Sequence, residues 1–265
     1  YYLLLHLWRA FTGASEFALR SYSALAGVLA VAVTAAIART ATRSAAVVQA
    51  VALRHYGDRS AIQGQIPALV AATLVAIHPL AVYYSQEARM SAQLSLVSAL
   101  TLWFAVVLIR RAGLSLPRRE PRGRSSLAPS TLAFALSIAA GLYTQYTYIL
   151  ALFGLNAAFC LLWLLSRLRP SSRHRTGGLL LRWIVAHALG ALLFMPWAPI
   201  ALRATGWRPP DLDTGRVIEA MATALLAGIT LPNDLAGLVF AAVGVLIALA
   251  VVVLAFGRRQ HRSMA

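Results

Sequence analysis

The stretch MSAQLSLVSALTLWFAVVLIR, residues 90–110, decides the fold class of this chain. It is almost wholly apolar, and its length matches the ~20 residues that an α-helix needs to cross a bilayer. Similar apolar runs recur at 23–39, 65–83, 131–147, 149–167, 180–202 and 235–256. The sequence therefore predicts an all-α, polytopic integral membrane bundle of about seven transmembrane helices.

The composition of the 265-residue chain agrees with this prediction. Hydrophobic residues make up 60% and charged residues 12%, and the mean hydropathy is +0.71. A soluble domain averages about 25% charged residues. Because the composition does not change along the chain, we expect one membrane domain over residues 1–265. The segments 1–20 and 216–229 are amphipathic and could lie along the membrane interface as helices.

The positive charge gives an orientation. The formal net charge is +16, and every basic residue is Arg. We place the final GRRQHR in the cytoplasm and follow the seven predicted crossings back towards the N-terminus. Four segments are then cytoplasmic, 39–62, 110–125, 167–182 and 257–265. They hold 18 of the 24 arginines and two of the eight acids. This positive-inside pattern explains the arginines better than nucleic-acid binding, which needs a soluble basic face with aromatic platforms.

The opposite, extracytoplasmic side gathers the polar and aromatic residues. The same tracing places YYSQEAR (83–89), YTQYTY (143–148) and the connection 203–234 there, with eight of the nine tyrosines. Tyrosine belts normally form at both membrane interfaces. A one-sided bias therefore predicts a functional site on this face.

The sequence contains one cysteine, Cys160, which lies in an apolar run. With a single cysteine, neither an intrachain disulfide nor a cysteine-based metal site is possible.

Four motifs in order resemble those of a known family. They are YYLLLHLWRAFTGASEFALRSYSALAGVLAV (1–31), HPLAVYYSQEARMSAQLSLVSAL (78–100), GLYTQYTYILAL (141–152) and FMPWAPIAL (194–202). Together they are similar to membrane glycosyltransferases of the GT-C fold, the group of the protein O-mannosyltransferases and the lipid A aminoarabinose transferases. The resemblance covers roughly residues 1–205.

The resemblance implies a reaction. The donor would be a sugar on a polyprenyl phosphate, and the acceptor a hydroxyl of a protein, lipid or polysaccharide outside the cytoplasm, with inversion at the anomeric centre. In the family a carboxylate of the first luminal loop activates the acceptor. That loop precedes the segment similar to YYLLL, so we expect the first helix and this carboxylate upstream of Tyr1. Gln145 stands where the family usually has histidine.

Glu87 and Arg89 are the sharpest candidates for chemistry. Glu87 could bind an acceptor hydroxyl, act as a general base or hold a divalent cation. It could also complement a helix dipole. Arg89 suits the phosphate leaving group, because a guanidinium presents a planar donor fork. The alternative is pairing with Glu16, Glu87 or a lipid headgroup. On a helix, residues two apart diverge, so we expect Glu87 and Arg89 to serve different partners.

Further polar and aromatic residues are candidates for substrate binding. The tyrosines could stack on a sugar, line the prenyl entrance or anchor the interface. Amide side chains could bind sugar hydroxyls, although Gln93 could instead join helices. His6 and Arg9 could touch the donor phosphate. The candidates beside Arg89 are Tyr83, Tyr84, Gln86, Gln145, Tyr146, His6 and Arg9, with Tyr148 considered alongside them.

The remaining sequence motifs give weaker evidence of function than Glu87 and Arg89. Asp211 and Asp213 form a D-x-D pair, but two prolines precede it and a helical run follows, which favours capping. No P-loop, G-x-G-x-x-G, H-E-x-x-H or C-x-x-C pattern occurs. Arg-only basic usage with abundant Ala indicates a GC-rich bacterial genome, hence the plasma membrane of a bacterium. Two alternatives stay open: a transporter or flippase for a lipid-linked glycan, and a non-catalytic membrane scaffold.

Overall fold

The computed structural model describes residues 1–52, 59–111, 128–167 and 173–204, and the positions 237, 241, 242, 244 and 245. The chain divides into two compact units, Tyr1–Ile77 with Ala81–Trp207 and His78–Leu80 with Arg208–Ala265. Nearly all described residues belong to the first unit. The predicted helices at 216–229 and 235–256 and the Asp211/Asp213 pair lie outside the described residues.

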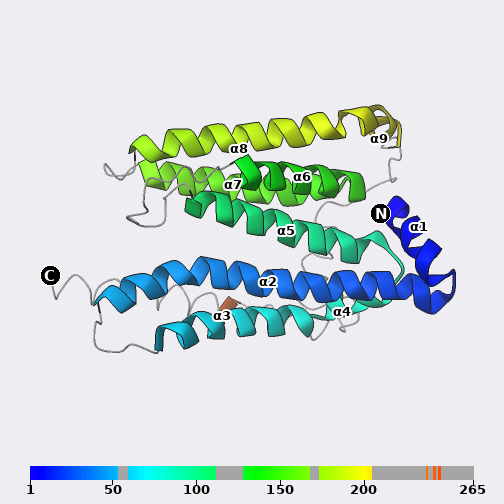
Figure 1. Cartoon of the computed structure of the whole chain (residues 1–265), viewed down its shortest axis with the longest axis horizontal. Coiled ribbons are helices and arrows are strands. Elements are labelled where there is room, and N and C mark those ends of the chain that lie inside the picture. The colour runs from blue at the N-terminus through cyan, green and yellow to red at the C-terminus, as the bar shows by residue number, and fades with distance from the viewer. Residues whose placement is uncertain are drawn as a thin grey trace. The chain divides into compact units, whose positions relative to one another are not determined.

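Every element in the described ranges is a helix, which confirms the all-α prediction (Figure 1). The elements are α1 (Tyr2–Thr12), α2 (Glu16–Ala52), α3 (Arg59–Ala76), α4 (Pro79–Gln86), α5 (Met90–Arg111), α6 (Ala128–Thr144), α7 (Tyr148–Arg167), α8 (Arg173–Phe194), the 3-10 turn η2 (Met195–Trp197) and α9 (Ala198–Ala204). Gly13, with φ of 87°, separates α1 from the start of α2. A residue other than glycine rarely adopts that conformation.

Three helical stretches are long and apolar enough to cross a membrane: Glu16–Thr42, Met90–Arg111 and Gly178–Ala201. Each contains one of the predicted runs or coincides with it closely. Two further runs form shorter apolar helices, Pro129–Thr144 and Tyr148–Leu164. The described residues thus support a membrane protein, and the count of about seven spans stays a prediction.

The predicted run 65–83 is broken rather than continuous. Gln65–Ala76 and Pro79–Gln86 are together long and apolar enough to cross a membrane. The axes of the two helices, however, are bent by 58° relative to each other. Pro79 is the physical cause, because proline has no N–H to donate and its ring clashes with the preceding helical turn. If the bent pair is one span, the described residues hold up to four.

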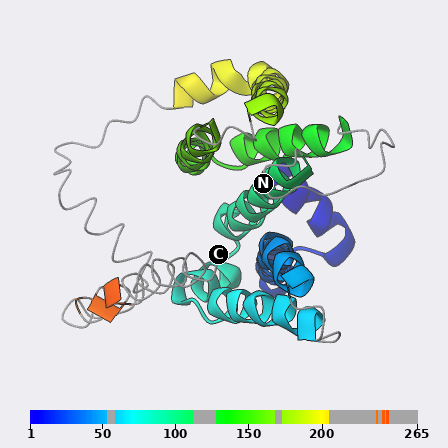
Figure 2. The same ribbon diagram turned by 90° about the vertical axis from the view of Figure 1, so that its left-hand side faces the viewer.

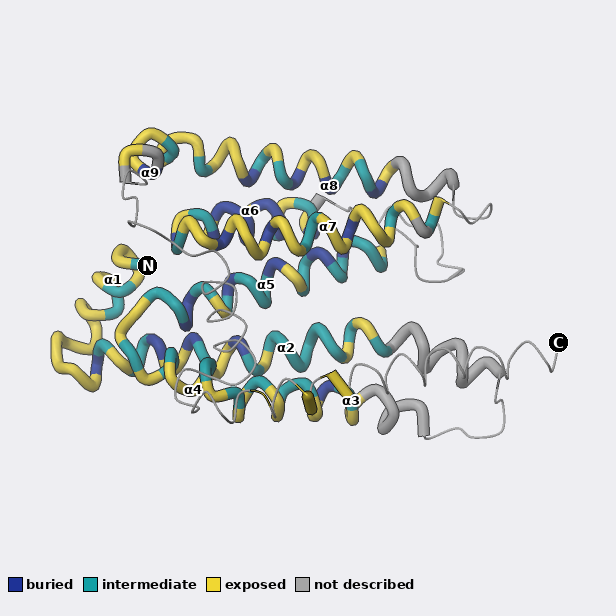
Figure 3. The backbone as a smooth tube through the Cα atoms, turned by 180° about the vertical axis from the view of Figure 1, so that it is seen from behind, coloured by how far each residue is buried: buried dark blue, intermediate teal, exposed yellow. Residues whose placement is uncertain are grey.

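Within the first unit, α5 is the central helix. It packs against α2 on one side and α6 on the other, α3 packs on α2, and α8 packs on α6. Figure 2, turned to look along the helices, shows α5 between blue α2 and green α6. The helices of this unit expose many apolar side chains, such as Leu69, Leu74, Phe153, Leu181 and Leu192. Figure 3 marks exposed positions in yellow along each helix. Soluble proteins rarely expose apolar surface on this scale, whereas lipid chains cover it in a membrane.

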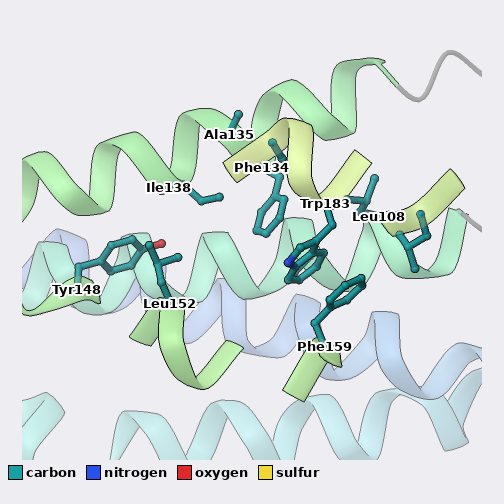
Figure 4. Close-up of a cluster of buried hydrophobic side chains, with 11 residues drawn as sticks. Leu108, Phe134, Ala135, Ile138, Tyr148, Leu152, Phe159 and Trp183 are labelled. Carbon is teal, nitrogen blue, oxygen red and sulfur yellow. The ribbon is translucent and has the colours of Figure 1, made fainter. Parts of the chain in front are cut away.

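Trp183 of α8 belongs to the cluster of buried hydrophobic side chains that α5, α6, α7 and α8 share (Figure 4). Its ring stacks on Phe159 of α7 with centroids 3.8 Å apart and an interplanar angle of 4°. Phe134 of α6 lies on it at 4.9 Å. The Trp183 indole N–H donates to Asn156 Oδ1 at 2.8 Å. One side chain therefore joins three helices by both packing and hydrogen bonding.

Asn156 and His187 complete this cluster. Asn156 Nδ2 lies 3.1 Å from His187 Nε2 and also donates to the Leu152 carbonyl at 2.8 Å. His187 Nδ1 lies 2.9 Å from the Trp183 carbonyl. A carbonyl only accepts, so Nδ1 carries the proton and Nε2 accepts from Asn156. These polar groups within apolar helices are thus satisfied internally and act as contacts between α7 and α8.

Candidate functional site

Glu87 and Arg89 lie in the turn between α4 and α5. The Arg89 backbone N–H donates to the Glu87 carbonyl at 2.8 Å, which closes a tight turn. Arg89 Nε lies 3.2 Å from Glu87 Oε2. The expectation that these two side chains diverge is wrong, since it assumed a helix and the residues lie outside one.

A shallow cleft of about 280 Å³ opens beside this turn. Its lining residues are Glu16, Leu19, Arg20, Glu87, Ala88 and Arg89. Glu16 and Arg20, at the start of α2, form an ion pair of 2.5 Å across one helical turn. The structure therefore brings two acids and two arginines together from segments far apart in the sequence. Arg20 was not a candidate from sequence; its only signal was an acid–base pair four residues apart where an apolar run begins.

Glu87 is the least exposed charged residue of this cleft. Its side chain is 26% exposed, against 57% for Arg20, 69% for Arg89 and 78% for Glu16. Its Oε2 atom is buried and receives no hydrogen bond of acceptable geometry within the described residues, although Arg89 lies close. A buried carboxylate oxygen left without a donor is costly. Glu87 can therefore accept a hydrogen bond from a group that enters the cleft.

A buried hydrogen-bond chain fixes the helices behind the cleft. Tyr22 of α2 donates to Gln93 Oε1 at 2.6 Å, and Gln93 Nε2 donates to Thr144 of α6 at 3.0 Å. Gln93 is only 6% exposed. Of its two sequence interpretations, the structure supports the junction between helices. Ser23 adds a weak bond of 3.4 Å to the Arg89 carbonyl.

This chain of hydrogen bonds also shows that the two turns predicted at 83–89 and 143–148 lie at the same end of the helical bundle (Figure 1). Gln93 lies one turn into α5, just after Arg89, and Thr144 is the last residue of α6. Gln145 and Tyr146 follow Thr144 directly. Tyr143 donates to the Leu193 carbonyl at 3.0 Å and so brings the end of α8 to this end too.

The remaining candidates lie outside the cleft lining. Tyr83 and Tyr84 pack edge to face in α4 with centroids 5.4 Å apart, and Gln86 ends that helix. Gln145 and the exposed Tyr146 lie in the turn between α6 and α7. Tyr148 is no surface residue: it is 1% exposed, and its hydroxyl lies 2.5 Å from Thr101 Oγ1 in the core.

His6 and Arg9 are exposed on α1. That helix is held against α2 by Trp8, whose indole N–H donates to the Ala18 carbonyl at 2.8 Å and whose ring makes a tilted contact with Tyr22. Tyr1, just before α1, makes an edge contact with Tyr22. Neither His6 nor Arg9 lines the cleft. In the described part of the chain, no group of three or more His, Cys, Asp or Glu side chains is placed to hold a metal ion.

Comparison of the chain with protein-family models, curated proteins and solved structures gives no match.

Proposed function

We propose that this chain is a multi-pass membrane glycosyltransferase of the GT-C type. It moves a sugar from a polyprenyl-phosphate donor to a hydroxyl acceptor on the extracytoplasmic side. The observation that carries the proposal is the cleft: two arginines and a half-buried carboxylate meet where two apolar helices begin. A carboxylate that is partly buried among apolar helices is costly, and such residues in membrane proteins are usually functional.

The cleft suits the two halves of a sugar transfer. The guanidinium groups of Arg20 and Arg89 can bind the phosphate oxygens and stabilise the charge of the leaving lipid phosphate. Oε2 of Glu87 can accept the proton of the acceptor hydroxyl, the role that the family resemblance gives to a carboxylate of the first luminal loop. The acceptor oxygen then bonds to the anomeric carbon as the bond from that carbon to the phosphate oxygen breaks. Attack opposite the leaving group inverts the anomeric centre.

A transporter or flippase for a lipid-linked glycan is the main alternative. Such a protein needs polar groups deep within its helices that are available to the substrate. The polar cluster of Asn156, Trp183 and His187 lies within α7 and α8, but its atoms bond to one another or to the backbone. The cluster therefore supports helix packing rather than a transport path.

The proposal is tested by transfer assays on the protein in lipid nanodiscs. A panel of polyprenyl-phosphate hexoses and pentoses serves as donors, and released polyprenyl phosphate is measured. We expect Glu87→Gln to lower the rate by about a hundredfold, in the range for a lost general base. Arg89→Ala and Arg20→Ala should each lower it by about tenfold, because each removes one charged phosphate contact.

Arg203→Ala is the matched control, since Arg203 is an exposed arginine of α9 outside the cleft lining. It should retain the rate of the unaltered protein. Turnover that is unchanged in both Glu87→Gln and Arg89→Ala would remove the cleft from the reaction.

A further inference from the structure

The charges of the cleft balance. Glu16 and Glu87 supply two negative charges, and Arg20 and Arg89 supply two positive ones, which gives a formal charge of zero. A ligand that is only anionic is attracted by the arginines and repelled by the carboxylates. A ligand with one positive and one negative group gains from both kinds of side chain. Each acid is already ion-paired with one arginine, so a dipolar ligand can exchange both ion pairs for contacts with its own two charges, whereas a simple anion replaces only one side of each pair.

The buried oxygen of Glu87 limits which kind of positively charged group the ligand can carry. Oε2 forms an ion pair with Arg89 Nε at 3.2 Å but has no hydrogen-bond donor of good geometry in the described residues. A primary ammonium offers three N–H donors, and a hydrogen bond between charged groups is stronger than one between neutral groups. A quaternary ammonium carries a positive charge but has no N–H. The ligand that fits Glu87 best therefore carries a protonated primary amine.

The position of the cleft indicates the source of the ligand. Glu16 begins the candidate span Glu16–Thr42, and Arg89 directly precedes the candidate span Met90–Arg111. Residues at the ends of membrane spans lie at the depth of the lipid headgroups. The neighbouring helix α1 leaves Leu3, Leu7 and Phe11 exposed. Such an apolar face at a span end lies against acyl chains.

We propose that the cleft binds the headgroup of a membrane phospholipid that carries both a phosphate and a primary amine, the chemistry of phosphatidylethanolamine. Arg20 and Arg89 hold the phosphate, and Glu87 with Glu16 holds the ammonium. This inference goes beyond sugar transfer and does not depend on it. If the chain also transfers sugars, the phosphate of the donor meets the same arginines, so the two lipids compete.

Lipid binding to the delipidated full chain tests the inference. Native mass spectrometry in detergent measures adducts with phosphatidylethanolamine, phosphatidylcholine and phosphatidylglycerol of identical acyl chains. We expect phosphatidylethanolamine to bind about tenfold more tightly than either of the others, the effect of one charge-assisted hydrogen bond. Glu87→Gln should abolish this preference. Arg89→Gln should weaken phosphatidylethanolamine binding by about tenfold.

Arg203→Gln removes the same charge outside the cleft and should leave binding unchanged. Arg20→Gln gives a second arginine variant if Arg89→Gln does not yield monodisperse protein. Equal binding of phosphatidylethanolamine and phosphatidylglycerol would overturn the inference. So would binding that Glu87→Gln and the arginine variant leave unaltered. Because the readout is a lipid adduct, loss of sugar transfer alone does not affect it.

Discussion

Trp183→Ala is expected to destabilise the helical bundle by about 3 kcal/mol, the lower part of the range for removing a buried Trp or Phe. Trp183 is 3% exposed and lies between Phe134 and Phe159, so its loss opens a cavity among α6, α7 and α8. Lipid chains are as apolar as the core of the bundle. The lost free energy of unfolding therefore comes mainly from packing contacts and less from transferring the side chain out of water.

Trp183→Phe separates packing from hydrogen bonding. It keeps an aromatic ring against Phe159 but removes the N–H that donates to Asn156. Hydrogen bonds between membrane helices average about 0.6 kcal/mol in double-mutant cycles, and we expect this variant to cost about 1 kcal/mol in all. Reversible unfolding in mixed detergent and dodecyl sulfate micelles gives both free energies. Equal losses for Trp183→Phe and Trp183→Ala would mean that the hydrogen bond, and not the packing, holds α7 to α8.

Gly141→Ala is expected to destabilise the bundle by about 1–3 kcal/mol, the usual cost of overpacking a core. A methyl group at Gly141 of α6 would overlap the ring of Tyr148. That ring cannot move away cheaply, because it is 1% exposed and its hydroxyl contacts Thr101. The close approach of α6 to the start of α7 thus requires glycine at this position.

Gly154→Ala is the matched control for Gly141→Ala. Gly154 lies in the middle of α7, and a methyl group there would meet no atom within 4 Å. Alanine favours a helix over glycine by up to about 1 kcal/mol, so this variant should be neutral or slightly stabilising. The same unfolding measurement compares the two. Similar destabilisation by both variants would contradict the contact between Gly141 and Tyr148.

The helices were predictable from the sequence, because length and hydropathy are local properties. The runs 90–110 and 180–202 coincide closely with candidate spans of the structure. The break at Pro79 near the end of the run 65–83 was also predictable from the sequence, since proline removes a backbone hydrogen bond and its ring clashes with the preceding helical turn.

The contacts among helices were not predictable from one sequence. Arg20 joins Glu87 and Arg89 only because α2 packs on α5. Asn156 and His187 were not among the candidates, and their pairing depends on how α7 meets α8. Tyr148 shared the sequence surroundings of Tyr146, yet one is buried and the other exposed. Which side of a helix faces its neighbours decides such differences.

Cysteine labelling tests most directly the central claim, that the turn holding Glu87 and Arg89 and the turn holding Gln145 lie on one face of the membrane. In a Cys160→Ala background, single cysteines at Ala88, Gln145 and Arg111 are treated with a membrane-impermeant maleimide in intact cells. The helix α5 has 22 residues, about 33 Å, and is long enough to place Arg111 at the opposite face if it crosses the membrane. We predict labelling from outside at positions 88 and 145, and at position 111 only after the cells are opened. Labelling of 88 and 145 from opposite sides would contradict the account.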